Sequence, residues 1–167
     1  MKFLGFDKVL CISPHPDDVE YSMLGTIMKH QDTEFELFQL AQGGDCDPST
    51  NKDRLIEVKN VWKQSMCKNV NIIFTDNVYI KELTEDKWIN KIEKHLDNTF
   101  DAICIPNDCD SHFEHRFVSG FGKALIRDKS INLVQYYTPS TQETWIPNTF
   151  VNIANQYDRK IDSLSNF

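Results

Sequence analysis

The chain has 167 residues, 40% of them hydrophobic, and its 18 basic and 25 acidic residues give a formal net charge of −7. This length and apolar content favour one domain, residues 1–167, with one sizeable core. Because the acidic balance opposes binding to a phosphate backbone, and the Lys and Arg residues are dispersed, we expect no nucleic-acid partner.

Apolar runs alternate with helical patterns along the chain. Strands are predicted at 8–13, 35–40, 71–74, 102–106 and 132–137, where apolar and β-branched residues gather. Helices are predicted at about 19–30 and along two apolar stripes, formed by Leu55, Val58, Trp62 and Met66, and by Trp88, Ile89, Ile92 and Leu96. This alternation predicts an α/β fold with a mainly parallel sheet and helices on both faces.

The segment 13–20, Ser-Pro-His-Pro-Asp-Asp-Val-Glu, directly follows the end of the apolar run of the first predicted strand. Its two prolines restrict the backbone on both sides of His15, so the direction of this imidazole relative to Asp17 and Asp18 is constrained. Such a segment is typical of a metal or catalytic site. It is also compatible with a capped helix start, in which one aspartate is the N-cap and His15 is solvated.

A second cluster, Asp-Ser-His-Phe-Glu-His-Arg at 110–116, follows the fourth predicted strand, and its His112 and His115 share one helix face. The carboxyl ends of parallel strands lie along one edge of a sheet, so both clusters are expected there. Imidazole and carboxylate groups without thiolates suit zinc or another divalent transition metal. Spacing alone does not decide which of these two histidines is a ligand. The remaining histidines, His30 and His95, are expected to be solvated.

Together, the Pro-His-Pro-Asp-Asp-x-Glu segment at 14–20 and the His-x-x-His-Arg segment at 112–116 resemble the LmbE/PIG-L family of zinc-dependent N-acetylglucosaminyl de-N-acetylases. The segments 136–141 and 147–153 are also similar to members that act on sugars. The family usually has Pro-Asp between its two histidines, whereas this chain has Phe-Glu. The resemblance implies a Rossmann-like three-layer sandwich.

The resemblance also implies a role for each matching residue. His15, Asp18 and His115 would bind the metal, and Asp17 would be the general base. His112 would stabilise the oxyanion, which a protonated imidazole could neutralise. These roles extend the two clusters into a complete set for hydrolysing an amide.

The expected function is therefore removal of the acetyl group from an N-acetylated amino sugar of the N-acetylglucosamine type, or from its conjugate. Arg54 is the nearest match to a family arginine that holds substrate hydroxyls, although an exposed helix arginine is an equally good interpretation. The alternative from another class is an inactive carbohydrate- or partner-binding protein on the same fold. A weaker alternative is a metal-dependent hydrolase of an ester or phosphoester.

Cysteine usage and the chain ends give expectations about location and assembly. The five cysteines are odd in number and include no C-x-x-C pair, which favours a reducing, cytoplasmic location. We expect no signal peptide and no membrane anchor. Compared with relatives the domain looks short at its C-terminus, and a homo-oligomer would arise if another subunit covers an apolar edge exposed there.

Overall fold

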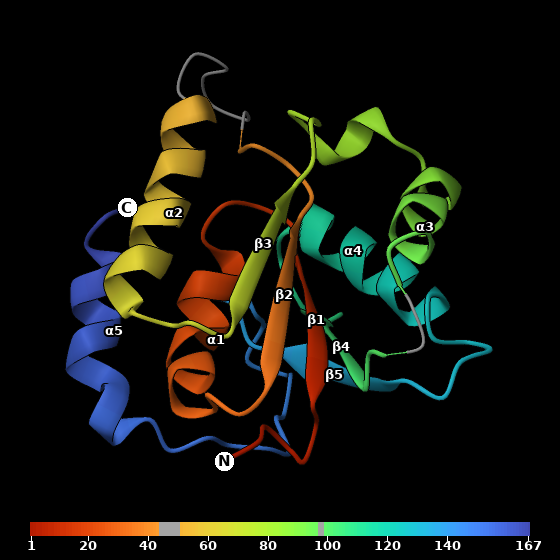
Figure 1. Ribbon diagram of the computed structural model, residues 1–167. Helices are drawn as coiled ribbons and strands as arrows, with labels where there is room; N and C mark the ends of the chain where they lie inside the picture. Colours follow the sequence, from red (N-terminus) through yellow and green to blue (C-terminus); the bar gives the residue numbers. More distant parts are fainter. Residues whose placement is uncertain (44–50, 97–98) are drawn as a thin grey trace.

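A five-stranded sheet forms the centre of the structure, a computed structural model that describes residues 1–43, 51–96 and 99–167 (Figure 1). All four pairs of neighbouring strands are parallel, and the strand order is β3-β2-β1-β4-β5. The strands are β1 Lys8–Ser13, β2 Glu34–Gln39, β3 Val70–Phe74, β4 Ala102–Pro106 and β5 Asn132–Tyr136. The five predicted strands are confirmed, with ends that differ by at most one residue.

Helices cover both faces of this sheet, which confirms the predicted three layers (Figure 1). One face carries α1 Asp18–Lys29, α2 Asn51–Ser65 and α5 Tyr157–Leu164, and the other carries α3 Glu85–Glu93 and α4 Phe113–Ala124. Short 3₁₀ turns occur at Ile80–Glu82 (η2) and Ala154–Gln156 (η3). The predicted stripe in α2 is wrong at its end, because Met66 lies beyond the helix with a φ of 58° and is exposed.

Alternate residues of each strand point into two separate apolar layers. In β1, Val9 and Cys11 pack in the layer beneath α1 and α2, whereas Leu10 and Ile12 pack in the layer beneath α3 and α4. All four are completely buried. A strand covered on both faces needs apolar residues at every position, which explains why the first predicted strand reads as a continuous apolar run.

The strand order places a change of direction beside β1. From β1 the chain builds outward through β2 and β3, and it then returns to place β4 on the other side of β1 and β5 beyond it. In a sheet of this type a crevice opens outside the carboxyl ends of the two strands at which the order reverses. These ends are Ser13 and Pro106, which precede the two clusters singled out in the sequence.

Cys11, Cys67, Cys104 and Cys109 are free thiols, and Cys46 lies outside the described residues. Across residues 1–43, 51–96 and 99–167, the longest apolar helical stretch is too short to cross a bilayer.

Two glycines of α4 offer a matched test of packing. A Cβ at Gly122 would lie 2.7 Å from Cγ2 of the buried Ile105 in β4, whereas a Cβ at Gly120 would meet no atom within 4 Å. We expect Gly122→Ala to lower the free energy of unfolding by about 1–2 kcal/mol, because overpacking outweighs the gain in helix propensity. Gly120→Ala should raise it by up to about 1 kcal/mol. Urea denaturation of both variants measures this, and equal effects would contradict the close α4–β4 contact.

Candidate metal centre

The turn between β1 and α1 presents the first cluster. Ser13 closes it by donating its hydroxyl to the His15 carbonyl (2.9 Å), and the His15 backbone N–H donates to Asp18 Oδ2 (2.9 Å). Asp17 is the N-cap residue of α1 and has a φ of 130°. A positive φ is uncommon outside glycine, and such strain tends to occur at functional sites. The turn is thus held in a conformation that fixes where the side chains of His15, Asp17 and Asp18 lie.

Asp18 joins the two clusters. Its Oδ2 lies 3.2 Å from His15 Nδ1, and its Oδ1 lies 3.1 Å from His115 Nε2. The carboxylate is buried, which alone would raise its pKa, but the hydrogen bonds to His115 and His15 lower it well below its usual range. Asp18 is therefore ionised between two imidazoles that lie 100 residues apart in the sequence.

The start of α4 presents the second cluster. His112 is the N-cap residue, and its Nδ1 accepts the Glu114 backbone N–H at 3.3 Å. Phe113 occupies the first helical position, where proline is favoured in general and where the family pattern has it. The change from Pro to Phe therefore leaves His112 beside the other histidines, with its ring centroid 4.9 Å from that of His15 and 4.6 Å from that of His115.

The three histidines make a donor set that fits a metal ion. One ligand atom from each of His15, His112 and His115 can be chosen so that all lie within 4.8 Å of one another. Asp18 adds carboxylate oxygens beside two of these rings. Nitrogen and oxygen donors of this kind suit zinc and similar divalent ions. The structure brings all the predicted ligands together, and it also brings in His112, so both ligand sets considered from the sequence are present.

Hydrogen bonds among these groups favour protonated histidines. Burial alone would lower the pKa of His15, but hydrogen bonds to Asp18 and Glu114 outweigh it and raise that pKa to about 10. Burial alone would also lower the pKa of His115, but its interactions with Asp18 and Asp110 outweigh burial and raise that pKa. A divalent cation among the same groups would compete with these protons. Burial and the charges of His15 and His115 lower the pKa of His112, which is the neutral ring of the three.

Asp110 is a member of the second cluster to which the sequence analysis assigned no role. It is completely buried, and its Oδ2 accepts from His115 Nδ1 at 3.0 Å. It also accepts from the hydroxyls of Thr138 and Ser140 and from the His112 backbone N–H. A carboxylate on the far nitrogen of a histidine ligand fixes its tautomer and ring orientation. Asp110 thus directs His115 Nε2 towards Asp18.

Glu114 is the other carboxylate of the second cluster for which no role was predicted from the sequence. It is buried, and its Oε2 lies 2.7 Å from His15 Nε2. This hydrogen bond outweighs burial and lowers the pKa of Glu114. The signal in the sequence was its place between the two histidines, but whether it would face the first cluster depended on the path of the chain.

Asp17 and Arg54 form a pair at the side of this centre. Arg54 Nη2 lies 2.7 Å from Asp17 Oδ2 and donates to the Pro16 carbonyl at 2.6 Å. The Asp17 side chain is 44% exposed, so solvent reaches it. Burial and the neighbouring Asp18 raise the pKa of Asp17, and Arg54 opposes this shift. The structure therefore places Arg54 at the candidate site.

Glu20, the last residue of the first motif, lies beneath the site. Its Oε1 accepts from Trp62 Nε1 at 2.5 Å, and its Oε2 has no hydrogen-bond partner among the described residues. Burial raises the pKa of this carboxyl to about 7. Glu20 links α1 to α2 at the base of the turn that carries Asp17 and Asp18.

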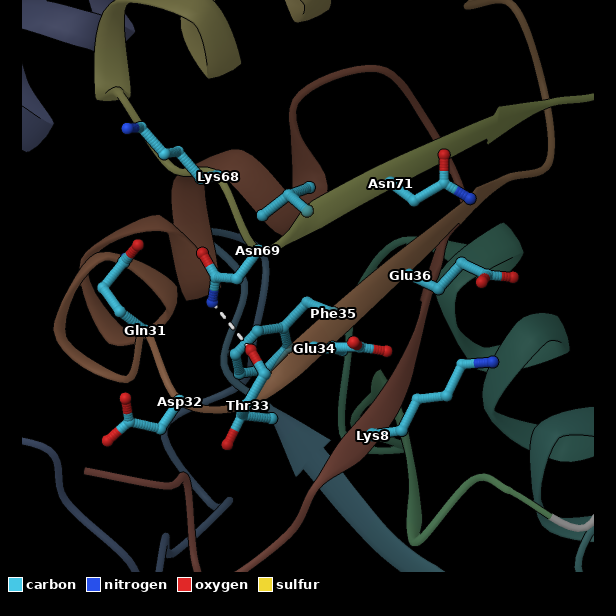
Figure 2. A pocket seen from close by; sticks show the side chains of 11 residues that line it. Lys8, Gln31, Asp32, Thr33, Glu34, Phe35, Glu36, Lys68, Asn69 and Asn71 are labelled. Carbon is cyan, nitrogen blue, oxygen red and sulfur yellow. Dashed lines mark hydrogen bonds between the residues drawn. The ribbon is translucent and has the colours of Figure 1, made fainter.

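A pocket and two further histidines lie away from the candidate metal centre. A pocket of about 500 Å³ lies near the amino ends of β2 and β3, whereas the candidate metal centre lies at the carboxyl ends of the strands. Polar and charged side chains such as Lys8, Glu34 and Glu36 line this pocket (Figure 2). His30 is buried and contacts the Met1 carbonyl, so the expectation that it is solvated is wrong. His95 is partly buried and pairs with Glu36.

Comparison with known families gives a match over most of the chain. The family described as GlcNAc-PI de-N-acetylase (PIG-L) matches residues 10–126, a stretch that contains both clusters. Comparison with curated protein sequences gives no significant match.

Solved structures with the same fold include enzymes of more than one kind. N,N'-diacetylchitobiose deacetylase from Pyrococcus horikoshii is 22% identical, with a TM-score of 0.71 over 98% of this chain and 70% of its own. A zinc-inhibited form of teicoplanin deacetylase is 10% identical, with a TM-score of 0.72 over 95% and 83%. The 4-carboxy-2-hydroxymuconate hydratase GalB from Pseudomonas putida is 14% identical, with a TM-score of 0.68 over 96% and 78%. At these identities the likeness shows the fold, and the fold alone does not specify one reaction.

Proposed function

The chain belongs to the GlcNAc-PI de-N-acetylase (PIG-L) family, and we propose that it is a zinc-dependent hydrolase that removes the acetyl group from an N-acetylated amino sugar or its conjugate. One observation carries this proposal. The structure gathers His15, Asp18, His112 and His115 at one end of the sheet, with the carboxylate of Asp17 close enough to interact with Asp18 and His15. An inactive binding protein would have no need of a base next to a complete set of metal ligands.

His15, Asp18 and His115 are the residues that we assign to the metal. Zinc bound there would polarise the acetamide carbonyl and activate a water molecule. Asp17 accepts the proton of the attacking water and later returns it to the leaving amine, since its pKa is raised and solvent reaches its side chain. Arg54 orients Asp17 through its Nη2, and we assign its further N–H donors to substrate hydroxyls.

His112 is the group that we assign to the oxyanion. Because its Nδ1 accepts a backbone N–H, the neutral ring carries its proton on Nε2. It therefore donates a hydrogen bond to the developing oxyanion as a neutral imidazole, rather than neutralising it as a cation. This differs from the protonated form considered from the sequence, and the lowered pKa of His112 supports it.

The His112 assignment makes a testable prediction. We expect His112→Ala to keep its zinc but to lower kcat by roughly a hundredfold to a thousandfold, the usual cost of losing one oxyanion donor. KM should change little, because the charge exists only in the transition state. His112→Asn is the matched variant, since Asn also serves as an N-cap and keeps the start of α4 intact. Loss of zinc in both variants would make His112 a ligand instead.

The proposed function itself is tested by amine release. The zinc-loaded chain is incubated with N-acetylglucosamine, chitooligosaccharides, N-acetylated nucleotide sugars and N-acetylglucosaminyl phosphatidylinositol, and free amine is measured. Release from at least one of them, abolished by a chelator and restored by zinc, is the expected result. Saturable binding without release would favour the inactive carbohydrate-binding protein, and cleavage confined to esters or phosphoesters would favour the other hydrolase.

A further inference from the structure

One large aromatic side chain beside the candidate centre lies outside the apolar core. Phe113 is 64% exposed at the first position of α4. The later apolar residues of the same helix, Val118 and Phe121, are completely buried against the sheet. Phe113 belongs to neither of the two apolar layers formed by the described residues. Single exposed apolar side chains are common on protein surfaces, but Phe113 stacks on a histidine of the candidate centre.

The Phe113 ring continues a series of rings that leads into the centre. Phe113 stacks on His112 with an interplanar angle of 10° and a centroid distance of 5.5 Å. His112 in turn stacks on His115, with an angle of 28° and a distance of 4.6 Å. The series therefore runs from an exposed phenyl ring, through the group assigned to the oxyanion, to a group assigned to the metal.

We propose that Phe113 is an aromatic platform on which the apolar face of a substrate pyranose ring stacks. This rests on the proposed function. A pyranose presents polarised C–H groups on one face, and the negative face of a phenyl ring attracts them. The carbon that bears the acetamide belongs to the sugar ring itself. A sugar whose acetamide carbonyl meets His112 is therefore held within reach of a ring 5.5 Å from His112.

The platform is a feature of this chain rather than of the family pattern. At the same helix position that pattern has proline, which supplies a smaller apolar surface and no aromatic face. Phe113 would therefore bias the chain towards substrates with an accessible apolar sugar face near the acetamide. It acts by binding, not by chemistry, because the ring carries no group that can donate or accept a proton.

The test compares Phe113→Ala and Phe113→Leu, which remove the aromatic face, with Phe113→Trp, which keeps it. Tyr157→Ala is the matched control, because Tyr157 is a 56% exposed aromatic residue at the first position of α5 and belongs to neither cluster. The substrates are N-acetylglucosamine and N,N'-diacetylchitobiose, with N-acetylethanolamine as an acetamide that has no ring. Binding of glucosamine to each zinc-loaded variant, measured by calorimetry, gives a readout that does not depend on turnover.

For Phe113→Ala we expect KM for the sugars and Kd for glucosamine to rise roughly threefold to tenfold, with kcat within twofold. Phe113→Leu should lie close to Phe113→Ala, and Phe113→Trp and Tyr157→Ala close to the natural chain. KM for N-acetylethanolamine should not change. Because the Phe113 side chain is outside both apolar layers, all variants should unfold at similar temperatures.

Two results would overturn the platform alone. A fall in kcat at constant KM would make Phe113 a residue that positions His112, and unchanged constants for both sugars would leave it without a role in binding. A natural chain that releases amine from none of the sugars would instead overturn the proposed function, and the platform with it. Sugar hydrolysis by the natural chain therefore separates the two failures.

Discussion

Replacing Asp17 by Asn is expected to lower kcat by about a hundredfold to ten-thousandfold while zinc content stays at the level of the natural chain. An amide oxygen cannot take up a proton from water at neutral pH, so the loss falls on the chemical step. The substitution disturbs little else. Asn has the same shape and tolerates a positive φ as readily as Asp, and its oxygen can still accept from Arg54 Nη2.

Asp76→Asn is the matched control, because Asp76 is an exposed aspartate that follows β3 at the same edge of the sheet. It should retain full turnover. Zinc content by atomic emission and turnover by amine release are measured on the same preparations. If Asp17→Asn loses zinc together with activity, Asp17 is a ligand, and if it keeps its activity, another group is the base.

The sheet could be predicted from the sequence because its signal is local. Each strand buried on both faces is a short run of apolar residues, and Ala102–Pro106 was predicted at the bounds that the structure has. α5 was not predicted. It is a short helix whose side chains are mostly exposed or partly buried, and its packing against α2 and α1 depends on contacts far away in the sequence.

Within the candidate site, the sequence predicted which residues meet but not how they are connected. Parallel strand ends bring Asp18 and His115 to one edge whatever the details of the loops. The partners of Asp110 are different, because two of them, Thr138 and Ser140, follow β5 and reach it only when the chain has folded. Glu114 meets His15 for the same reason. The spacing of residues within one segment does not determine which side chains of a distant segment they will meet.

His115→Ala is expected to weaken zinc binding by at least about a hundredfold, since loss of an outer partner of a ligand alone costs ten- to a hundredfold. His115 is the residue on which Asp18 and Asp110 both converge, at 3.1 and 3.0 Å. Its removal takes away one nitrogen donor and also leaves two buried carboxylates with fewer partners. Competition with a zinc-binding dye measures the affinity, and activity should fall to background at the zinc concentrations at which the natural chain is saturated.

The chain should still fold, because Asp18 keeps His15, and Asp110 keeps the hydroxyls of Thr138 and Ser140. His115→Gln, which retains a polar group, checks this by thermal unfolding in the absence of zinc. When zinc is added, we expect the midpoint to rise for the natural chain and not for His115→Gln. His95→Ala removes a histidine that pairs with Glu36 outside the centre and should leave zinc affinity unchanged. Comparison with His112→Ala then decides between the ligand sets. If His115→Ala keeps its zinc and His112→Ala loses it, the metal is held by His112, and His115 becomes the group to assign to the oxyanion.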